Sequence, residues 1–250
     1  MLLQLLRHAT LLIELNGKML LVDPMLSDKE AMAPIVNSSN DRRNPLVELM
    51  APDGYLSKID AVLLTHTHRD HFDDAAAQKL PKDKPVLCQP EDEAKLLKLG
   101  FEKIIPIEDK IQWEDIEIIR TGGQHGTGEI GHLMSPVSGY VLKTSAEPSL
   151  YIAGDTIYCK EVETALATHW PQITVLNGGG AQFIVGDPIT MTAEDVKQVL
   201  VFYPDTKVVV VHLEAINHCL ITRDNFRSYL NNKELAGRVS IPVDGEILEF

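Results

Sequence analysis

Cysteine is scarce in this sequence. Only Cys88, Cys159 and Cys219 occur among 250 residues, and they lie far apart. An odd number of isolated cysteines provides neither a Cys-pair zinc site nor a disulfide framework. Such a pattern is typical of proteins in a reducing compartment, so we expect a cytoplasmic location.

Basic residues are also few. The chain has 23 Lys and Arg against 36 Asp and Glu, which gives a net charge of −13. A broad nucleic-acid footprint needs a basic face, so no nucleic-acid partner is expected. A small anionic substrate remains compatible with this charge, because bound divalent cations invert the local field.

Long hydrophobic runs are absent. No stretch approaches the roughly 18 apolar residues of a membrane span, so no membrane association is expected. The leucine-rich residues 1–6 lack a preceding basic region and are followed at once by Arg7 and His8, unlike a signal peptide. With 44% hydrophobic and 24% charged residues, the chain is expected to form one soluble domain over residues 1–250.

One short stretch concentrates metal-binding residue types: His66, His68, Asp70 and His71 fall within six positions. The residues before it are apolar and β-branched and predict a buried strand, and the residues after it predict a helix. The stretch therefore connects a strand to a helix, where substrate sites are favoured in layered α/β folds. Imidazole nitrogens suit zinc and its first-row neighbours. A loop of solvated histidines is the alternative.

Two later strand ends carry further candidate ligands. His125 follows a strand predicted over residues 111–121, in a glycine-rich loop that lets the backbone approach a ligand closely. Asp155 ends a buried strand, and its carboxylate could bridge two metals. The alternatives are an ordinary loop histidine for His125 and, for Asp155, the N-cap of a helix predicted near residues 160–168.

The valine-rich strand over residues 207–211 ends at His212, and His218 follows six positions later. We favour His212 as the last metal ligand. His218 is the rival for that position, or else a substrate contact or a general acid. The isolated histidines at positions 8, 132 and 169 receive no assignment.

Several other segments give expectations that the structure can test. Asn16-Gly17 predicts a tight turn within a hairpin over residues 10–22, which ends at Asp23. Residues 25–58 are irregular and are either a lid over the active site or a surface excursion. The glycines at 178–180 form either a plain turn or an anion-binding loop. Residues 239–250 are expected to close the chain as a hairpin.

The run His66-x-His68-x-Asp70-His71 resembles the signature of the metallo-β-lactamase superfamily. The Gly-Asp-Thr sequence at 154–156 resembles the bridging aspartate of that superfamily, and residues 138–142 fit its ascorbate-phosphate lactonase-like branch. The resemblance implies an αββα sandwich, in which two mixed β-sheets are flanked by helices. It also implies a first metal held by His66, His68 and His125, a second held by Asp70, His71 and His212, Asp155 as the bridge, and Asp23 as either a support of the metal loop or a turn residue.

The same resemblance implies an enzyme with two divalent metal ions, zinc first, with manganese or iron as alternatives. A metal-bridged hydroxide would attack a small ester, lactone or phosphodiester, and Asp70 or His218 would manage the leaving-group proton. The alternatives are a mononuclear iron oxygenase acting on a thiol or persulfide, and a metal-binding module without turnover. The expected partner is a small, possibly anionic, substrate, and a homo-oligomer could form through an exposed hairpin or lid.

Overall fold

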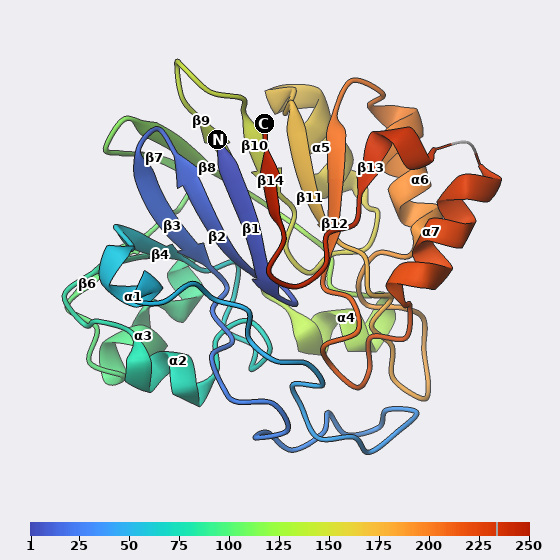
Figure 1. Cartoon of the computed structure of the whole chain (residues 1–250), viewed down its shortest axis with the longest axis horizontal. Helices are drawn as coiled ribbons and strands as arrows, with labels where there is room; N and C mark the ends of the chain where they lie inside the picture. The colour runs from blue at the N-terminus through green and yellow to red at the C-terminus, as the bar shows by residue number, and fades with distance from the viewer. Residues whose placement is uncertain (234) are drawn as a thin grey trace.

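Two seven-stranded mixed β-sheets face each other in this computed structural model, and helices cover their outer faces (Figure 1). The structure describes residues 1–233 and 235–250. The predicted sandwich of two mixed sheets flanked by helices is confirmed. The first sheet has the order β14-β1-β2-β3-β4-β5-β6, with the bounds β1 (Leu2–Arg7), β2 (Thr10–Leu15), β3 (Lys18–Val22), β4 (Ala61–Leu63), β5 (Pro85–Cys88), β6 (Lys103–Pro106) and β14 (Ile247–Glu249).

The second sheet has the order β13-β12-β11-β10-β9-β8-β7. Its strands are β7 (Lys110–Trp113), β8 (Ile116–Thr121), β9 (Gly139–Lys143), β10 (Leu150–Ile152), β11 (Ile173–Asn177), β12 (Lys207–Val211) and β13 (Val239–Ser240). Both sheets are antiparallel in one half and parallel in the other. Because parallel strands end at the same edge, the loops after β3, β4, β10, β11 and β12 can meet at one seam between the sheets.

Helices lie on both sides of the sandwich. In Figure 1, α1 to α3 lie beside the first sheet, and α5 to α7 lie beside the second. The helices are α1 (Tyr55–Lys58), α2 (Asp74–Lys79), α3 (Glu93–Lys98), α4 (Gly128–Met134), α5 (Lys160–His169), α6 (Ala193–Phe202) and α7 (Arg223–Asn232), with short 3₁₀ turns η1 (Pro90–Asp92) and η2 (Ala236–Arg238). None of the described helices is long and apolar enough to cross a bilayer.

Three apolar layers hold these elements together. The inner faces of the two sheets share one core, which includes Leu5, Ile13 and Tyr140. The other two layers join α2 and α3 to the first sheet and α5 to α7 to the second. Burying apolar side chains on both faces of each sheet favours this four-layer arrangement.

The predicted first hairpin is present, whereas the predicted closing hairpin is wrong. Asn16 and Gly17 both take positive φ, 52° and 70°, between β2 and β3. At the other end of the chain, β13 pairs with β12 in the second sheet and β14 pairs with β1 in the first. The connection contains Pro242, which has no N–H to offer a β-ladder, so the chain leaves one sheet before joining the other.

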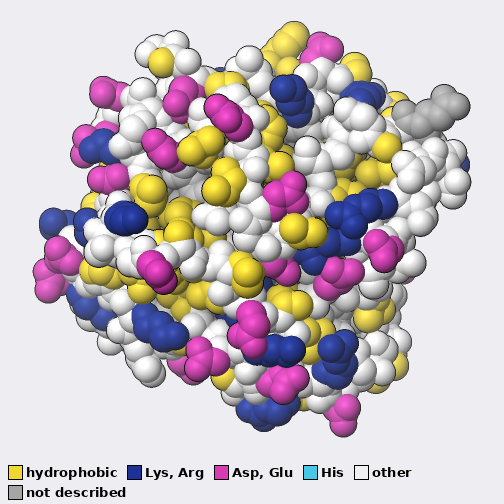
Figure 2. Space-filling model, in the orientation of Figure 1, with side chains coloured by type: hydrophobic (Ala, Val, Ile, Leu, Met, Phe, Trp, Pro, Cys, Tyr) yellow, Lys and Arg dark blue, Asp and Glu magenta, His cyan; other side chains and the backbone are white. Residues whose placement is uncertain are grey.

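Charges of both signs are interspersed on the face that Figure 2 shows. Apolar side chains also gather between the charged ones on this face. This mixture gives no continuous basic surface there of the kind that tracks a nucleic-acid backbone.

Candidate metal centre

The residues that the sequence singles out converge at the seam between the two sheets. Six of the seven predicted ligand side chains are buried and one, His68, is half-buried. Their ligand atoms form three overlapping groups, each with all atoms within 4.8 Å of one another. The first group is His66, His68 and His125, and the second is Asp70, His71 and His212 together with His8, which was not predicted as a ligand; a third set, His66, His71 and Asp155, overlaps both.

The first group lies where the loop after β4 meets the loop after β8. His66 Nε2 lies 3.0 Å from His68 Nδ1. His125 Nε2 lies 3.4 Å from Asp155 Oδ2. These separations are those of atoms that can share one cation, because ligands about 2.1 Å from a zinc ion lie roughly 3–4 Å apart.

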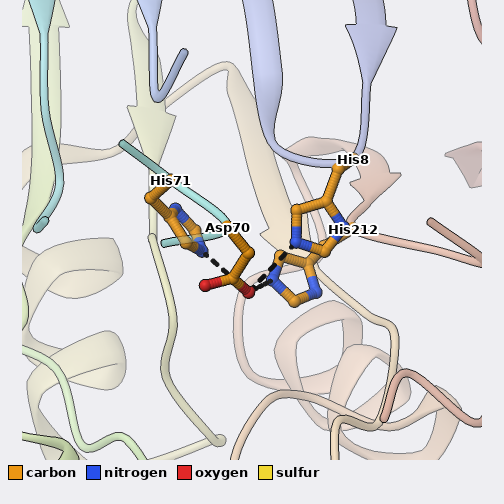
Figure 3. A group of neighbouring side chains, drawn as sticks. All are labelled: His8, Asp70, His71 and His212. Atoms are coloured by element: carbon orange, nitrogen blue, oxygen red, sulfur yellow. Dashed lines mark hydrogen bonds and ion pairs between the residues drawn. The ribbon is translucent and has the colours of Figure 1, made fainter. Parts of the chain in front are cut away.

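Figure 3 shows the second group, in which His8, His71 and His212 surround Asp70. Asp70 Oδ2 is 3.6 Å from His212 Nε2 and 3.9 Å from His71 Nε2. Asp155 touches this group as well, because its Oδ2 is 3.2 Å from His71 Nε2 and its Oδ1 is 3.3 Å from His212 Nε2. Asp155 therefore contacts both groups and lies between them.

The far ring nitrogen of several histidines is anchored. His71 Nδ1 lies 2.8 Å from Asp23 Oδ2, and His125 Nδ1 lies 2.8 Å from the carbonyl oxygen of Ile189. A proton held on Nδ1 by such an acceptor leaves the Nε2 lone pair free to bind a metal. The buried Nε2 atoms of His71 and His212 have no hydrogen-bond partner among the described residues. Orphaned nitrogens beside carboxylates fit a divalent cation.

The carboxylates and histidines of the cluster shift one another's pKa values. Burial disfavours ionised carboxylates, but the nearby histidines outweigh burial and hold the pKa of Asp70 and Asp155 well below the usual range. Burial also disfavours imidazolium, yet Asp155, Asp23 and Asp70 raise the pKa of His71 to about 10. Without metal, the cluster therefore binds protons at positions where a metal cation could bind instead.

Asp23 supports the metal loop by three hydrogen bonds. Its Oδ1 accepts the Thr65 N–H at 2.8 Å, and its Oδ2 accepts the Thr65 hydroxyl at 2.7 Å as well as facing His71 Nδ1. Thr65 Oγ1 in turn lies 3.0 Å from His66 Nδ1. Of the two readings of Asp23, the geometry favours the supporting one.

His212 and His218 occupy different places. His212 Nε2 faces the carboxylates, whereas His218 belongs to none of the three ligand groups and lines a cavity beside them. Burial lowers the pKa of His218, but the neighbouring Cys219 and the charge of Asp70 outweigh burial, so the net shift is upward. His218 therefore lies beside the cluster rather than within it, and its role as a general acid stays a prediction.

Three residues near the site were not identified from the sequence. His8 joins the second group from the turn between β1 and β2. Asn177 donates from Nδ2 to Asp155 Oδ1 at 2.7 Å and so orients that carboxylate. Asn217 fastens the long loop, as described below. Their positions in the sequence could have indicated a role at the site, because His8 follows one strand and Asn177 ends another, and both strands run toward the same edge.

The glycines after β11 serve close packing. A Cβ on Gly179 would lie 2.1 Å from the carbonyl oxygen of His212, and one on Gly178 would lie 2.5 Å from a methyl carbon of Val210. No side chain fits at either distance, so glycine lets this loop approach the His212 backbone. Packing explains these residues without an anion.

Residues 25–58 form one wall of the cavity over the cluster, through Ile35, Val36 and Asn37. The buried side chain of Asn217 fastens this segment. Its Oδ1 accepts from Ile35 N at 2.9 Å and from Asn44 Nδ2 at 2.8 Å, and its Nδ2 donates to the carbonyl oxygens of Ile35 and Asn40 at 3.1 and 2.9 Å. The segment thus covers the site in a defined conformation.

The cavity has a volume of about 700 Å³ and opens onto His68, Asp70 and His125. Its other walls are largely aliphatic and aromatic. They come from the long loop, from α4 and from the segment before α6, and comprise Ile35, Val36, Ile130, Leu133, Met134, Phe183, Ile184, Val185 and Ile189. Among the described lining residues, Arg69 is the single Lys or Arg. A pocket of this size and lining suits a small, mainly apolar molecule.

Comparison with known proteins gives a consistent set of relatives. A family model described as "Beta-lactamase superfamily domain" matches residues 19–213. The UPF0173 protein YddR of Bacillus subtilis (strain 168) is 37% identical over 248 residues, which are 98% of each chain. A UPF0173 metal-dependent hydrolase of Bacillus cereus (strain Q1) is 30% identical over 196 residues, which are 75% of this chain and 74% of that protein.

Two solved structures resemble the whole chain. The crystal structure of an isothiocyanate hydrolase from Delia radicum gut bacteria has a TM-score of 0.95 and 39% sequence identity, and the match covers 100% of this chain and 99% of the other. That of a possible metal-dependent hydrolase from Veillonella parvula DSM 2008 has a TM-score of 0.96 and 29% identity, with the same coverage.

Proposed function

The chain belongs to the β-lactamase superfamily and is a metal-dependent hydrolase, and from that premise we propose that it uses two divalent cations to hydrolyse small neutral molecules that carry an apolar group. We propose isothiocyanates as the first substrate class to test. The observation that carries the proposal is the apolar cavity of about 700 Å³ that opens onto the Asp and His cluster.

The two groups of side chains at the seam supply the proposed ligands. His66, His68 and His125 would hold the first cation, and Asp70, His71 and His212 the second, with Asp155 between them. Zinc suits this mixture of nitrogen and oxygen donors, and manganese and iron are the alternatives. Two bound cations would supply an activated water near neutral pH and positive charge beside the reacting atoms.

The cavity walls support a neutral, apolar substrate over the other classes that the sequence suggests. A phosphodiester or a phosphorylated lactone carries negative charge, for which the walls provide Arg69 alone among the described lining residues. An alkyl or aryl group would instead bury its surface against Ile130, Met134 and Phe183. Burial of that kind contributes roughly 25 cal/mol per Å² of apolar surface.

An isothiocyanate combines such an apolar group with an electrophilic carbon, and a structural neighbour 39% identical to this chain is named an isothiocyanate hydrolase. In its hydrolysis the oxygen of water adds to the central carbon, and the nitrogen gains two protons, the second as the C–N bond breaks. The products are an amine and carbonyl sulfide. We propose that His218, at the cavity wall, donates a proton to that nitrogen, while Asp70 serves as a ligand.

Substrate consumption by protein loaded separately with zinc and manganese tests this proposal. The panel comprises isothiocyanates with increasing apolar chains, a neutral lactone and a chromogenic phosphodiester. We expect isothiocyanate loss that increases with chain length, that disappears in His68→Ala and in chelated protein, and that is retained in the control His169→Ala, a substitution on α5. Turnover in metal-free protein would refute the metal mechanism, and cleavage of the phosphodiester alone would refute the substrate class.

A further inference from the structure

His8 lies in an unusual backbone conformation at the seam. It occupies the turn between β1 and β2, with φ at 59°, and its side chain is completely buried. Residues other than glycine rarely adopt positive φ, and such conformations persist when surrounding contacts hold them. One of those contacts is with the metal centre, because the His8 carbonyl oxygen accepts the backbone N–H of His212 at 2.9 Å.

The His8 side chain points into the second ligand group (Figure 3). Its Nε2 lies 3.3 Å from Asp70 Oδ2. Its ring lies against the ring of His212, with centroids 3.6 Å apart and planes tilted by 38°. His8 therefore contacts two of the three side chains proposed for the second cation, through a polar contact, a ring contact and a backbone hydrogen bond.

The geometry separates a supporting role from that of a ligand. Two imidazoles that bind one ion approach it from directions roughly 90° or more apart, so their rings diverge. The rings of His8 and His212 instead lie against each other, with centroids 3.6 Å apart and planes tilted by 38°. His8 Nε2 lies 3.3 Å from Asp70 Oδ2, and a nitrogen that donates its N–H to that carboxylate has no lone pair left for a cation, which places His8 beside the ligands.

The proton on the His8 ring can also be placed. A neutral imidazole carries one N–H, on either Nδ1 or Nε2. On Nδ1, which has no hydrogen-bond partner among the described residues, that N–H would be buried without an acceptor. On Nε2 it donates to Asp70 Oδ2. The second arrangement avoids the cost of an unsatisfied buried donor.

We propose that His8 is a positioning residue for the second metal: it orients the Asp70 carboxylate by an Nε2–H hydrogen bond and holds the His212 ring in place by packing against it. The inference rests on the proposed two-metal site. Hydrogen-bond partners of metal ligands typically change metal affinity by about 10–100-fold when they are removed. His8 packs against His212 and reaches Asp70, so the effect should fall on the second cation.

Two substitutions distinguish the positioning role from general packing. His8→Asn preserves tolerance of positive φ, since asparagine adopts this conformation more readily than most residues, but its amide reaches only as far as Nδ1. His8→Gln places an amide N–H at the reach of Nε2. The control is His169→Asn, a substitution at a half-exposed histidine on α5.

The readout is zinc stoichiometry and stepwise affinity, measured by competition with a chromogenic chelator, together with the visible spectrum of cobalt-substituted protein. We expect His8→Asn to weaken one cation about 10–100-fold, His8→Gln to recover part of that loss, and the coordination number seen by cobalt to stay unchanged in His8→Gln. Equal loss at both sites, equal behaviour of the two variants, or loss of a nitrogen ligand in the cobalt spectrum would overturn the inference. Wild-type protein that binds fewer than two cations would instead refute the two-metal proposal itself.

Discussion

Replacing Asp23 by asparagine should weaken the second metal site while leaving the backbone in place. Asp23 has φ of 44°, a conformation that asparagine tolerates. The carboxylate of Asp23 accepts from Thr65 N, Thr65 Oγ1 and His71 Nδ1. An asparagine amide can keep the Thr65 N–H bond through its oxygen, but its NH₂ group then faces His71.

The expected magnitude follows from that exchange. An NH₂ group beside His71 Nδ1 favours the ring tautomer whose proton is on Nε2, the atom that faces the second ligand group. Loss of a hydrogen bond to a charged group costs about 1.5–3 kcal/mol. At about 1.4 kcal/mol per factor of ten, this corresponds to roughly 10–150-fold weaker binding of the second cation.

The assay is chelator-competition titration of Asp23→Asn in the His68→Ala background, where the remaining high-affinity ion reports on the second group. The matched control is Asp60→Asn, because the Asp60 side chain accepts the Met19 N–H at 2.8 Å and lies outside the ligand groups. Affinity within threefold of the His68→Ala parent would refute the reasoning that Asp23 fixes the His71 tautomer.

Three further changes have defined outcomes. Asn217→Ala removes four hydrogen bonds of the loop wall and should lower the free energy of unfolding by about 2–4 kcal/mol; urea titration and the rate of proteolysis within residues 35–44 check this. Phe183→Ala removes part of the cavity wall and should lower kcat/KM about 5–30-fold for aryl isothiocyanates, from about 1–2 kcal/mol of lost apolar contact, but little for methyl isothiocyanate. In metal-free protein the pKa of His71 is raised to about 10. Protonated His71 therefore stabilises the fold fully below the pKa of an unfolded histidine, about 6.5, and this stabilisation is lost as the pH rises toward 10. Thermal unfolding without metal should show a Tm that falls between pH 7 and 10, and a flat Tm would contradict this.

Local sequence carried much of the fold and the ligand groups. The four candidate ligands between His66 and His71 must lie close together whatever the rest of the chain does, because they fall within six residues on one strand-to-helix turn. His125, Asp155 and His212 could be chosen because each follows a recognisable strand, and strands of one sheet that run in the same direction end at the same edge.

The remaining features depend on pairings that are remote in sequence. His8 looks isolated in the sequence, and only the pairing of β1 with β2 and the meeting of the two sheets bring it to Asp70 and His212. The prediction of a closing hairpin failed for the same reason. Residues 239–250 contain two strand-like runs, but each pairs with a longer strand of a different sheet. A local pattern specifies a strand more readily than it specifies the strand's neighbour.

The position of the metal centre at the seam between the sheets affects how the molecule unfolds. His66, His68, Asp70 and His71 follow a strand of the first sheet, whereas His125, Asp155 and His212 follow strands of the second. Cations held by both sets would act as reversible cross-links between the two halves of the chain, closing long loops whose entropy otherwise favours separation. Removal of the metal should then lower the cooperativity of unfolding, so that the two halves unfold in separate steps. The supply of metal would thereby govern the lifetime of the protein in the presence of proteases.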